Sequence, residues 1–198
     1  MARFVVVVDT QWDFIADEGA LSVAGAEDLV APMRAWLSAL SAEDTAGVLF
    51  TFDTHFRETY AASPEAAMFP IHCVRGTRGW ENMLDVALVD PAIPTWRIEK
   101  GVFDMWAEPG LVIEDARDAG RSAIAREAFF TDLAASGIAD VIVIGVAADY
   151  CVRWAVEGLI AHGFGVTVPV LLTRGIERQI ETVVADDFVG RSVVLQRD

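Results

Sequence analysis

A strand that runs directly into a helix, within residues 141–159, is the feature that most constrains the fold of this chain. Residues 141–146 form a continuous apolar run rich in β-branched side chains, which is typical of a strand buried on both faces of a parallel sheet. From Ala148 onward, apolar residues recur at helical spacing, and Asp149 stands in the first turn, where a helix dipole favours an acid. This pattern predicts a sheet that is covered by helices.

The same alternation of strand and helix extends over the whole chain. Apolar runs with β-branched or aromatic residues predict strands at residues 4–8, 48–52, 93–98, 140–146, 165–172 and 193–195. Helical spacing predicts helices at residues 26–40, 125–133, 148–162 and 175–185. The alternation predicts a three-layer α/β/α fold with an open, mostly parallel six-stranded sheet.

The middle of the chain is harder to place. Pro94 interrupts the strand at residues 93–98, which favours a position nearer the edge of the sheet. Residues 112–119 are compatible with a short helix or with a loop insertion. Residues 54–81 form a long irregular stretch that holds several Pro and Gly, and loops of this length inside compact domains are usually functional.

Length and charge limit the classes of protein to which the chain can belong. Its 198 residues contain no Pro/Gly/Ser-rich linker, which predicts a single domain over residues 1–198. The formal net charge of −15 argues against a nucleic-acid partner or an anionic membrane, since both require a basic surface. The two cysteines form no disulfide framework and the amino terminus shows no signal peptide or membrane span, so we expect a cytoplasmic protein. Hydrophobic α/β domains of this size often pair, which predicts a homo-oligomer.

Cys151 lies at the predicted junction of strand and helix, close to the amino end of the helix. There the helix dipole and free backbone N–H groups would stabilise a thiolate and hold an oxyanion, the two requirements of acyl transfer to sulfur. The alternative is a buried, inert cysteine, because Cys is among the residue types most often buried. This stretch alone leaves both interpretations open.

Other polar residues lie at the carboxyl ends of predicted strands, where open α/β sheets bind their ligands. They are Asp9, Asp53 and Lys100, and we expect them to converge with Cys151 on one edge of the sheet. Asp9 could take the proton of the Cys151 thiol while Lys100 keeps both groups ionised. A buried Lys–Asp ion pair without chemistry is the alternative.

Asp53 and His55 lie two residues apart at the end of a strand, so their side chains point to the same side and can hold one ion together. Glu65 and His72 follow on the long loop and complete a set of oxygen and nitrogen donors suited to Zn, Mn or Fe. Such a set leaves positions for water or substrate. The alternative is that the Asp-x-His pair is only a hydrogen-bonded anchor of the loop.

Several segments together resemble the signature of the isochorismatase-like cysteine hydrolases. They are Asp9-x-Gln11-x-Asp13-Phe14, Glu99-Lys100-Gly101 and Gly145-Val-Ala-Ala-Asp-Tyr-Cys151-Val, in the order that the family has. The stretch from Asp53-Thr-His55 through Glu65 and Phe69-Pro-Ile-His72 to Glu81 is similar to the metal loop of the nicotinamidase/pyrazinamidase branch. The similarity covers nearly the whole chain, to the Thr173-Arg-Gly175 turn.

The resemblance implies a catalytic triad of Asp9, Lys100 and Cys151. It also implies a non-proline cis peptide bond between Val146 and Ala147, with the backbone N–H groups of Ala147 and Cys151 forming an oxyanion hole. The aromatic walls of the substrate pocket would come from Phe14, Phe69, Phe103 and Tyr150. Ordinary core packing is the alternative explanation for each ring.

The activity that the resemblance implies is hydrolysis of a small amide. In the nicotinamidase branch one divalent ion is held by residues that correspond to Asp53, His55, Glu65 and His72, and it receives the pyridine nitrogen of the substrate. The chain would then convert nicotinamide and water to nicotinate and ammonia, a step of NAD salvage, through a thioester on Cys151. A family member acting on another small amide, ureide or vinyl ether is the alternative, and a non-catalytic protein of this fold is another.

Some residues depart from the family pattern. Ala148 replaces the Thr that is usual in the segment before the cysteine, and Leu171 stands where an acidic residue commonly precedes the Thr173-Arg turn. Residues 101–122 follow no pattern that can be aligned. These departures bear on the choice of substrate more than on the triad.

Overall fold

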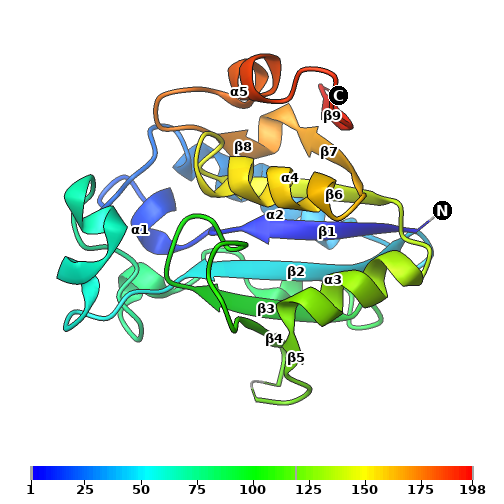
Figure 1. The fold of residues 1–198 in the computed structure, drawn as a ribbon, viewed down its shortest axis with the longest axis horizontal. Coiled ribbons are helices and arrows are strands. Elements are labelled where there is room, and N and C mark those ends of the chain that lie inside the picture. The colour runs from blue at the N-terminus through cyan, green and yellow to red at the C-terminus, as the bar shows by residue number, and fades with distance from the viewer. Residues whose placement is uncertain (1, 119, 198) are drawn as a thin grey trace.

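The computed structural model describes residues 2–118 and 120–197, so both ends of the expected domain, Met1 and Asp198, and also Ala119 lie outside the described residues. Its centre is a nine-stranded sheet in the order β5-β4-β3-β2-β1-β6-β7-β9, with β8 paired to β6 (Figure 1). The strands are β1 (Arg3–Val8), β2 (Thr45–Asp53), β3 (Thr95–Lys100), β4 (Val112–Asp115), β5 (Ile124–Ala125), β6 (Asp140–Val146), β7 (Gly165–Pro169), β8 (Thr173–Arg174) and β9 (Val193–Gln196).

Helices cover both faces of the sheet, with α3 and α4 in front and α2 behind in Figure 1. The α-helices are α1 (Trp12–Ile15), α2 (Val30–Ser38), α3 (Arg126–Ala135), α4 (Cys151–Ala161) and α5 (Ile180–Asp187). Short 3-10 helices are η1 (Glu27–Leu29), η2 (Tyr60–Ala62), η3 (Pro64–Ala67), η4 (Arg78–Trp80), η5 (Val86–Leu88) and η6 (Val170–Leu172). None of the helices within the described residues has the length and apolar character needed to cross a bilayer.

Strand β1 shows why both faces of the sheet are covered. Phe4, Val6 and Val8 join the hydrophobic cluster formed with α3 and α4, whereas Val5 and Val7 join the cluster formed with α1 and α2. Side chains alternate along a strand, so a strand that is apolar throughout must be buried on both faces. The predicted three-layer α/β/α fold with a mostly parallel sheet is confirmed.

The sheet has nine strands rather than the six expected. Residues 112–115 are neither a short helix nor a loop insertion, because they form β4, which pairs antiparallel with β3 and with β5. The strand expected to reach residue 172 ends at Pro169, and β8 follows after η6. β5 and β8 have only two residues each, too few for a periodic pattern, and two of the four residues of β4 are acidic, which is why β4, β5 and β8 were missed.

The third strand was expected nearer the edge of the sheet, and β3 lies third from one end of the strand order, with β4 and β5 outside it. Pro94 comes just before β3, where its missing N–H group interrupts no ladder. Its carbonyl oxygen accepts a hydrogen bond from the N–H of Val48 at 3.0 Å. The proline therefore begins the strand instead of ending the sheet.

Parallel pairing brings the carboxyl ends of β1, β2, β3 and β6 to one edge of the sheet. Gly145 of β6 pairs with Val8 of β1 at this edge and has a φ of 116°. A Cβ atom at Gly145 would collide with the backbone carbonyl of Val8. The absence of a side chain there lets the end of β6 approach β1 one residue before Asp9.

Candidate active site

The structure brings Asp9, Lys100 and Cys151 together at the carboxyl edge of the sheet. Asp9 follows β1, Lys100 is the last residue of β3 and Cys151 is the first residue of α4. The Lys100 Nζ atom lies 2.8 Å from Asp9 Oδ2 and 3.6 Å from Cys151 Sγ. All three residues are buried, with exposed fractions of 0% for Asp9, 2% for Lys100 and 4% for Cys151. A sulfur, an ammonium and a carboxylate thus meet out of contact with bulk water.

The segment that precedes Cys151 has the backbone form that the family resemblance implies. The peptide bond between Val146 and Ala147 is cis. The carbonyl of Ala147 accepts hydrogen bonds from Tyr150 N and Val152 N, which folds the segment into a tight turn against the start of α4. The N–H of Ala147 and the N–H of Cys151 therefore belong to one compact turn beside the sulfur.

Burial and neighbouring charges set the ionisation of the triad. Burial raises the pKa of the Cys151 thiol well above its ordinary value, against the opposing influence of the Lys100 ammonium. Burial alone would lower the pKa of Lys100, but the carboxylates of Asp53 and Asp9 outweigh it and raise that pKa well above its usual range. Cys151 consequently rests as a thiol beside a permanent cation, and its activation requires a base.

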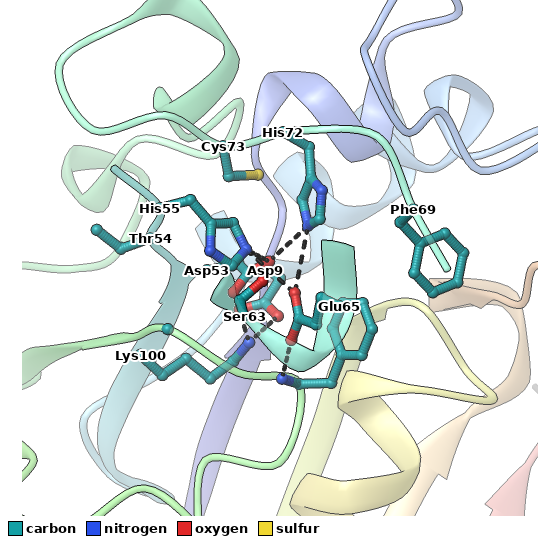
Figure 2. Close-up of polar contacts among 12 residues, drawn as sticks. Asp9, Asp53, Thr54, His55, Ser63, Glu65, Phe69, His72, Cys73 and Lys100 are labelled. Atoms are coloured by element: carbon teal, nitrogen blue, oxygen red, sulfur yellow. Dashed lines mark hydrogen bonds and ion pairs between the residues drawn. The ribbon is translucent and has the colours of Figure 1, made fainter. Parts of the chain in front are cut away.

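The four side chains expected to bind metal also converge. One donor atom from each of Asp53, His55, Glu65 and His72 lies within 4.8 Å of the others, and all four residues are buried. Asp53 Oδ2 is 3.2 Å from His55 Nε2 and 2.9 Å from His72 Nε2. Glu65 Oε2 is 3.1 Å from His55 Nε2, and these side chains point toward one another in Figure 2.

The donor set fits a divalent cation. His72 Nδ1 lies 2.8 Å from the carbonyl oxygen of Pro70, to which it donates, so that its Nε2 lone pair is available to an ion. Within the described residues, Glu65 Oε2 is buried and, apart from its 3.1 Å contact with His55, accepts no hydrogen bond of regular geometry. Burial lowers the pKa of His55, but Asp53 and Glu65 outweigh it and raise that pKa to about 9. The cluster therefore attracts positive charge, and two carboxylates with two imidazoles suit Zn, Mn or Fe.

Lys100 joins the metal-binding cluster to the triad. Its Nζ atom lies 3.5 Å from Asp53 Oδ1, on the side of Asp53 away from the histidines. Burial raises the pKa of Asp53, but Lys100 and the two histidines lower it well below its usual range. One ammonium thus balances a carboxylate from each group, which makes the two groups a single buried charge network.

Aromatic side chains gather beside the metal-binding cluster, where the ring centroid of Phe103 lies 6.2 Å from that of His72. The rings of Phe69, Phe103 and Tyr150 contact one another edge to face, with centroid distances of 5.5, 5.4 and 5.4 Å. Phe14 lies deeper, with its ring centroid 5.2 Å from that of His72. Three of the four expected rings therefore form one cluster, which we call the aromatic wall, and the fourth packs under the metal-binding cluster.

The aromatic wall is attached to the metal-binding cluster through one carboxylate. Glu65 Oε1 accepts a hydrogen bond from the backbone N–H of Phe103 at 2.6 Å, while its Oε2 faces the histidines (Figure 2). The segment that carries Phe103 is held on its other side by the buried guanidinium of Arg126, which donates to the carbonyl oxygens of Met105 and Glu108. Residues 101–111, which follow no family pattern, are therefore part of the site.

Two residues whose roles the sequence did not reveal hold the metal loop in place. The Gln11 side chain accepts from Asp53 N at 2.7 Å and donates to Asp53 O at 2.8 Å, so it clamps the end of β2. The Asp13 carboxylate accepts from Cys73 N at 2.7 Å, directly after His72. The signal was the presence of polar side chains next to a fully apolar strand, where each needs a buried partner.

Other departures prove to lie outside the reacting centre. Asp149 is not in the first turn of a helix, because α4 begins at Cys151. Its carboxylate accepts hydrogen bonds from the backbone N–H groups of residues 176–178. Ala148 is buried, and its backbone N–H donates to the carbonyl oxygen of Arg174. This backbone hydrogen bond anchors the turn without a side-chain hydroxyl. Leu171 is 63% exposed.

Comparisons with known proteins agree with this architecture. A model of the isochorismatase domain family matches residues 3–179. The chain belongs to the isochorismatase family. It is 29% identical over 198 residues to the nicotinamidase/pyrazinamidase of Mycobacterium tuberculosis, covering 98% of this chain and 97% of that protein.

Solved structures of the family share the fold. The pyrazinamidase of Pyrococcus horikoshii in complex with zinc has a TM-score of 0.71 and 24% identity, and the match covers 100% of both chains. PnC1 from L. infantum in complex with nicotinate has a TM-score of 0.74 and 24% identity, over 99% of this chain and 92% of that one. At this level of identity the structural matches establish the fold, and the activity must be argued from the site.

Proposed function

We propose that this member of the isochorismatase family is a metal-assisted cysteine amidohydrolase that converts nicotinamide and water to nicotinate and ammonia. The observation that carries the proposal is the 3.5 Å contact between Lys100 and Asp53, which unites a cysteine triad with a metal-binding cluster in one buried site. The similarity to the mycobacterial nicotinamidase/pyrazinamidase over nearly the full length of both chains supports it. The aromatic wall supplies a surface on which a flat pyridine ring can stack.

The first half of the reaction makes a thioester. Cys151 Sγ attacks the carboxamide carbon as its proton passes to Asp9. The N–H groups of Ala147 and Cys151 donate to the oxygen that becomes negative, and Lys100 balances the charge of Asp9 throughout. The carbon–nitrogen bond then breaks as Asp9 returns the proton to the leaving nitrogen, which departs as ammonia.

The second half releases the acid. Asp9 takes a proton from a water molecule as the water oxygen attacks the thioester carbon, and the same N–H groups again hold the oxyanion. Collapse of this intermediate breaks the carbon–sulfur bond, yields nicotinate and restores the thiol. A divalent ion on Asp53, His55, Glu65 and His72 would bind the pyridine nitrogen as a Lewis acid and so orient the ring.

Ammonia release from nicotinamide, with and without chelation, tests the proposal. We expect turnover that chelation abolishes, and the metal among Zn, Mn and Fe that restores it identifies the natural ion. Parallel assays with N-carbamoyl compounds and isochorismate separate nicotinamidase activity from other activities of the family. Faster turnover of one of these compounds than of nicotinamide would overturn the proposed substrate.

We also propose that the chain acts as a cytoplasmic single-domain homo-oligomer on a small-molecule amide, without nucleic-acid or membrane partners. Its formal net charge of −15 supports the absence of anionic partners. Sedimentation of the purified protein tests the oligomeric state, and a monomer at micromolar concentration would contradict it.

A further inference from the structure

Asp9 has an unusual backbone that must be held by its surroundings. Its φ is 46°, in the left-handed region that non-glycine residues rarely adopt, and the residue is 0% exposed. A buried residue in this conformation persists only where neighbouring groups determine it, and such residues cluster at functional sites.

Thr51 of the neighbouring strand β2 provides that support through one hydroxyl group. Thr51 Oγ1 accepts a hydrogen bond from Asp9 N at 3.2 Å and donates one to Asp9 Oδ1 at 2.5 Å. Thr51 is 1% exposed, so water does not compete for these contacts. A hydroxyl oxygen can accept from the backbone N–H and donate to the carboxylate at the same time, whereas a methyl group in its place can do neither.

The two carboxylate oxygens of Asp9 consequently have different tasks. Oδ1 is engaged by Thr51, and Oδ2 lies 2.8 Å from Lys100 Nζ. Within the described residues, Oδ2 is buried and accepts no hydrogen bond of regular geometry. The oxygen left available to receive a proton is therefore the one on the side of Lys100, whose Nζ also contacts the Cys151 sulfur.

We propose that Thr51 is a positioning residue for the reaction, because its hydroxyl locks the Asp9 carboxylate with Oδ2 directed into the triad. The inference rests on the proposed function only in that Asp9 carries the proton of Cys151. Thr51 does not contact the substrate in this proposal, because its hydroxyl already accepts a hydrogen bond from Asp9 N and donates one to Asp9 Oδ1. Loss of the hydroxyl frees the carboxylate to rotate, so the chemical step slows while the binding surfaces stay in place.

Thr51→Val and Thr51→Ser, with Thr95→Val as control, test the proposal on the metal-loaded enzyme. Thr95 is also a buried threonine of a central strand, but within the described residues its hydroxyl has no hydrogen-bond partner. For Thr51→Val we expect kcat to fall by about 100-fold with KM within about twofold, since general acid–base catalysis contributes at least this much. Thr51→Ser should recover kcat to within about fivefold of the wild type, and Thr95→Val should keep it within about twofold.

The rate of Cys151 alkylation by iodoacetamide, followed by mass spectrometry of the Cys151 peptide, distinguishes this proposal from the proposed function. Thr51→Val should slow alkylation by about 10-fold at pH 7 and Thr51→Ser should not, whether or not nicotinamide is the substrate. Equal alkylation rates in wild type and Thr51→Val would overturn the positioning role. If the wild type releases no ammonia from nicotinamide but is alkylated faster than Thr51→Val, the proposed substrate is overturned and the positioning role of Thr51 is not.

Thr51→Ala provides a second variant if the methyl group that replaces the hydroxyl in Thr51→Val prevents folding. It removes the hydroxyl without placing a methyl group against the carboxylate, and we expect the same fall in kcat. A fall in kcat that Thr51→Ser shares in full, or a rise in KM as large as the fall in kcat, would show that Thr51 has only a structural role.

Discussion

The reacting groups and the groups that surround the substrate are held in two different ways. Asp9, Lys100 and Cys151 belong to or directly follow regular elements, whose positions are determined by parallel ladders through the centre of the sheet. Glu65 lies in the short 3-10 helix η3 and Phe103 lies on an irregular segment, and both parts are attached by hydrogen bonds between side chains and backbone. We refer to the sheet and the helix that hold Asp9, Lys100 and Cys151 as the framework, and to residues 54–81 and 101–111 as the loops.

This difference matches what each part has to do. Cys151 is only 4% exposed, so neighbouring groups have to move before a substrate can reach its sulfur. The loops can open at the cost of a few hydrogen bonds, whereas a shift of the framework would break the central sheet. The chemistry is thus placed on the part that does not have to move.

The largest effect is expected in the framework, from Cys151→Ala. Removal of the nucleophile should lower ammonia release by at least about 10⁴-fold, the scale on which loss of a covalent nucleophile acts. The loops do not depend on the sulfur, so the melting temperature and the metal content measured by elemental analysis should stay close to those of the wild type. Retained ammonia release in this variant would defeat the assignment of Cys151.

The second largest effect is expected in the loops, from Glu65→Ala. The change removes both a metal ligand and the acceptor of the Phe103 N–H, so we expect activity to fall by about 10- to 100-fold and metal affinity to fall with it. Hydrogen exchange should become faster at residues 101–111 and stay unchanged in β1 and β3. Glu58→Ala changes an exposed carboxylate of the same loop and serves as control. Faster exchange in β1 as well would show that the framework and the loops are not independent.

A smaller effect is expected from Arg126→Met, which removes the side chain that holds residues 101–111 on the side opposite Glu65. The buried carbonyl group of Met105 and the partly buried one of Glu108 lose their donor, so the free energy of unfolding should fall by about 1–3 kcal/mol. Because we propose that the aromatic wall contributes to substrate binding and not to the chemical step, KM for nicotinamide should rise more than kcat falls. Arg121→Met is the control, because Arg121 lies between β4 and β5 with a side chain 71% exposed, and it should change neither value. A fall in kcat at constant KM would instead place residues 101–111 in the chemical step.

The smallest effect concerns an ion network that secures the helix of Cys151 to α5. Arg178 and Arg153 lower the pKa of Asp187 to about 2, from an ordinary value of 3.8. A lowered pKa means that the stabilisation is complete above about pH 4 and is lost as the pH falls toward 2. Asp187→Asn should therefore lower the free energy of unfolding at pH 6 by less than about 1 kcal/mol, and the difference from wild type should shrink below pH 4.

Urea unfolding at pH 6, 4 and 3 measures this dependence. Asp186→Asn is the matched control, because its side chain is 58% exposed and its contact with Arg178 is longer, at 3.6 Å. Ammonia release at pH 7 should be the same in both variants and in the wild type, since the network lies outside the triad. A difference in stability that does not change with pH would contradict the role of the Asp187 charge.

The sequence by itself determined the framework and the residue types of the site. Apolar runs ending in Asp9, Asp53 and Lys100 predict parallel strands, and parallel strands can only end at one edge, so the convergence of these groups follows from local pattern. The loops carried ligands that could be named, Glu65 and His72, but no pattern that places them.

Only the tertiary structure decided how the loops and the minor strands are arranged. Residues 112–115 form a strand because β3 offers a free edge there, and Phe103 reaches the site because Glu65, distant in sequence, accepts its N–H. The same holds for the two contacts of Thr51 with Asp9. Periodicity records which face of an element is buried, but a single hydrogen bond between distant residues leaves no periodic trace, so it becomes visible only when the chain is folded.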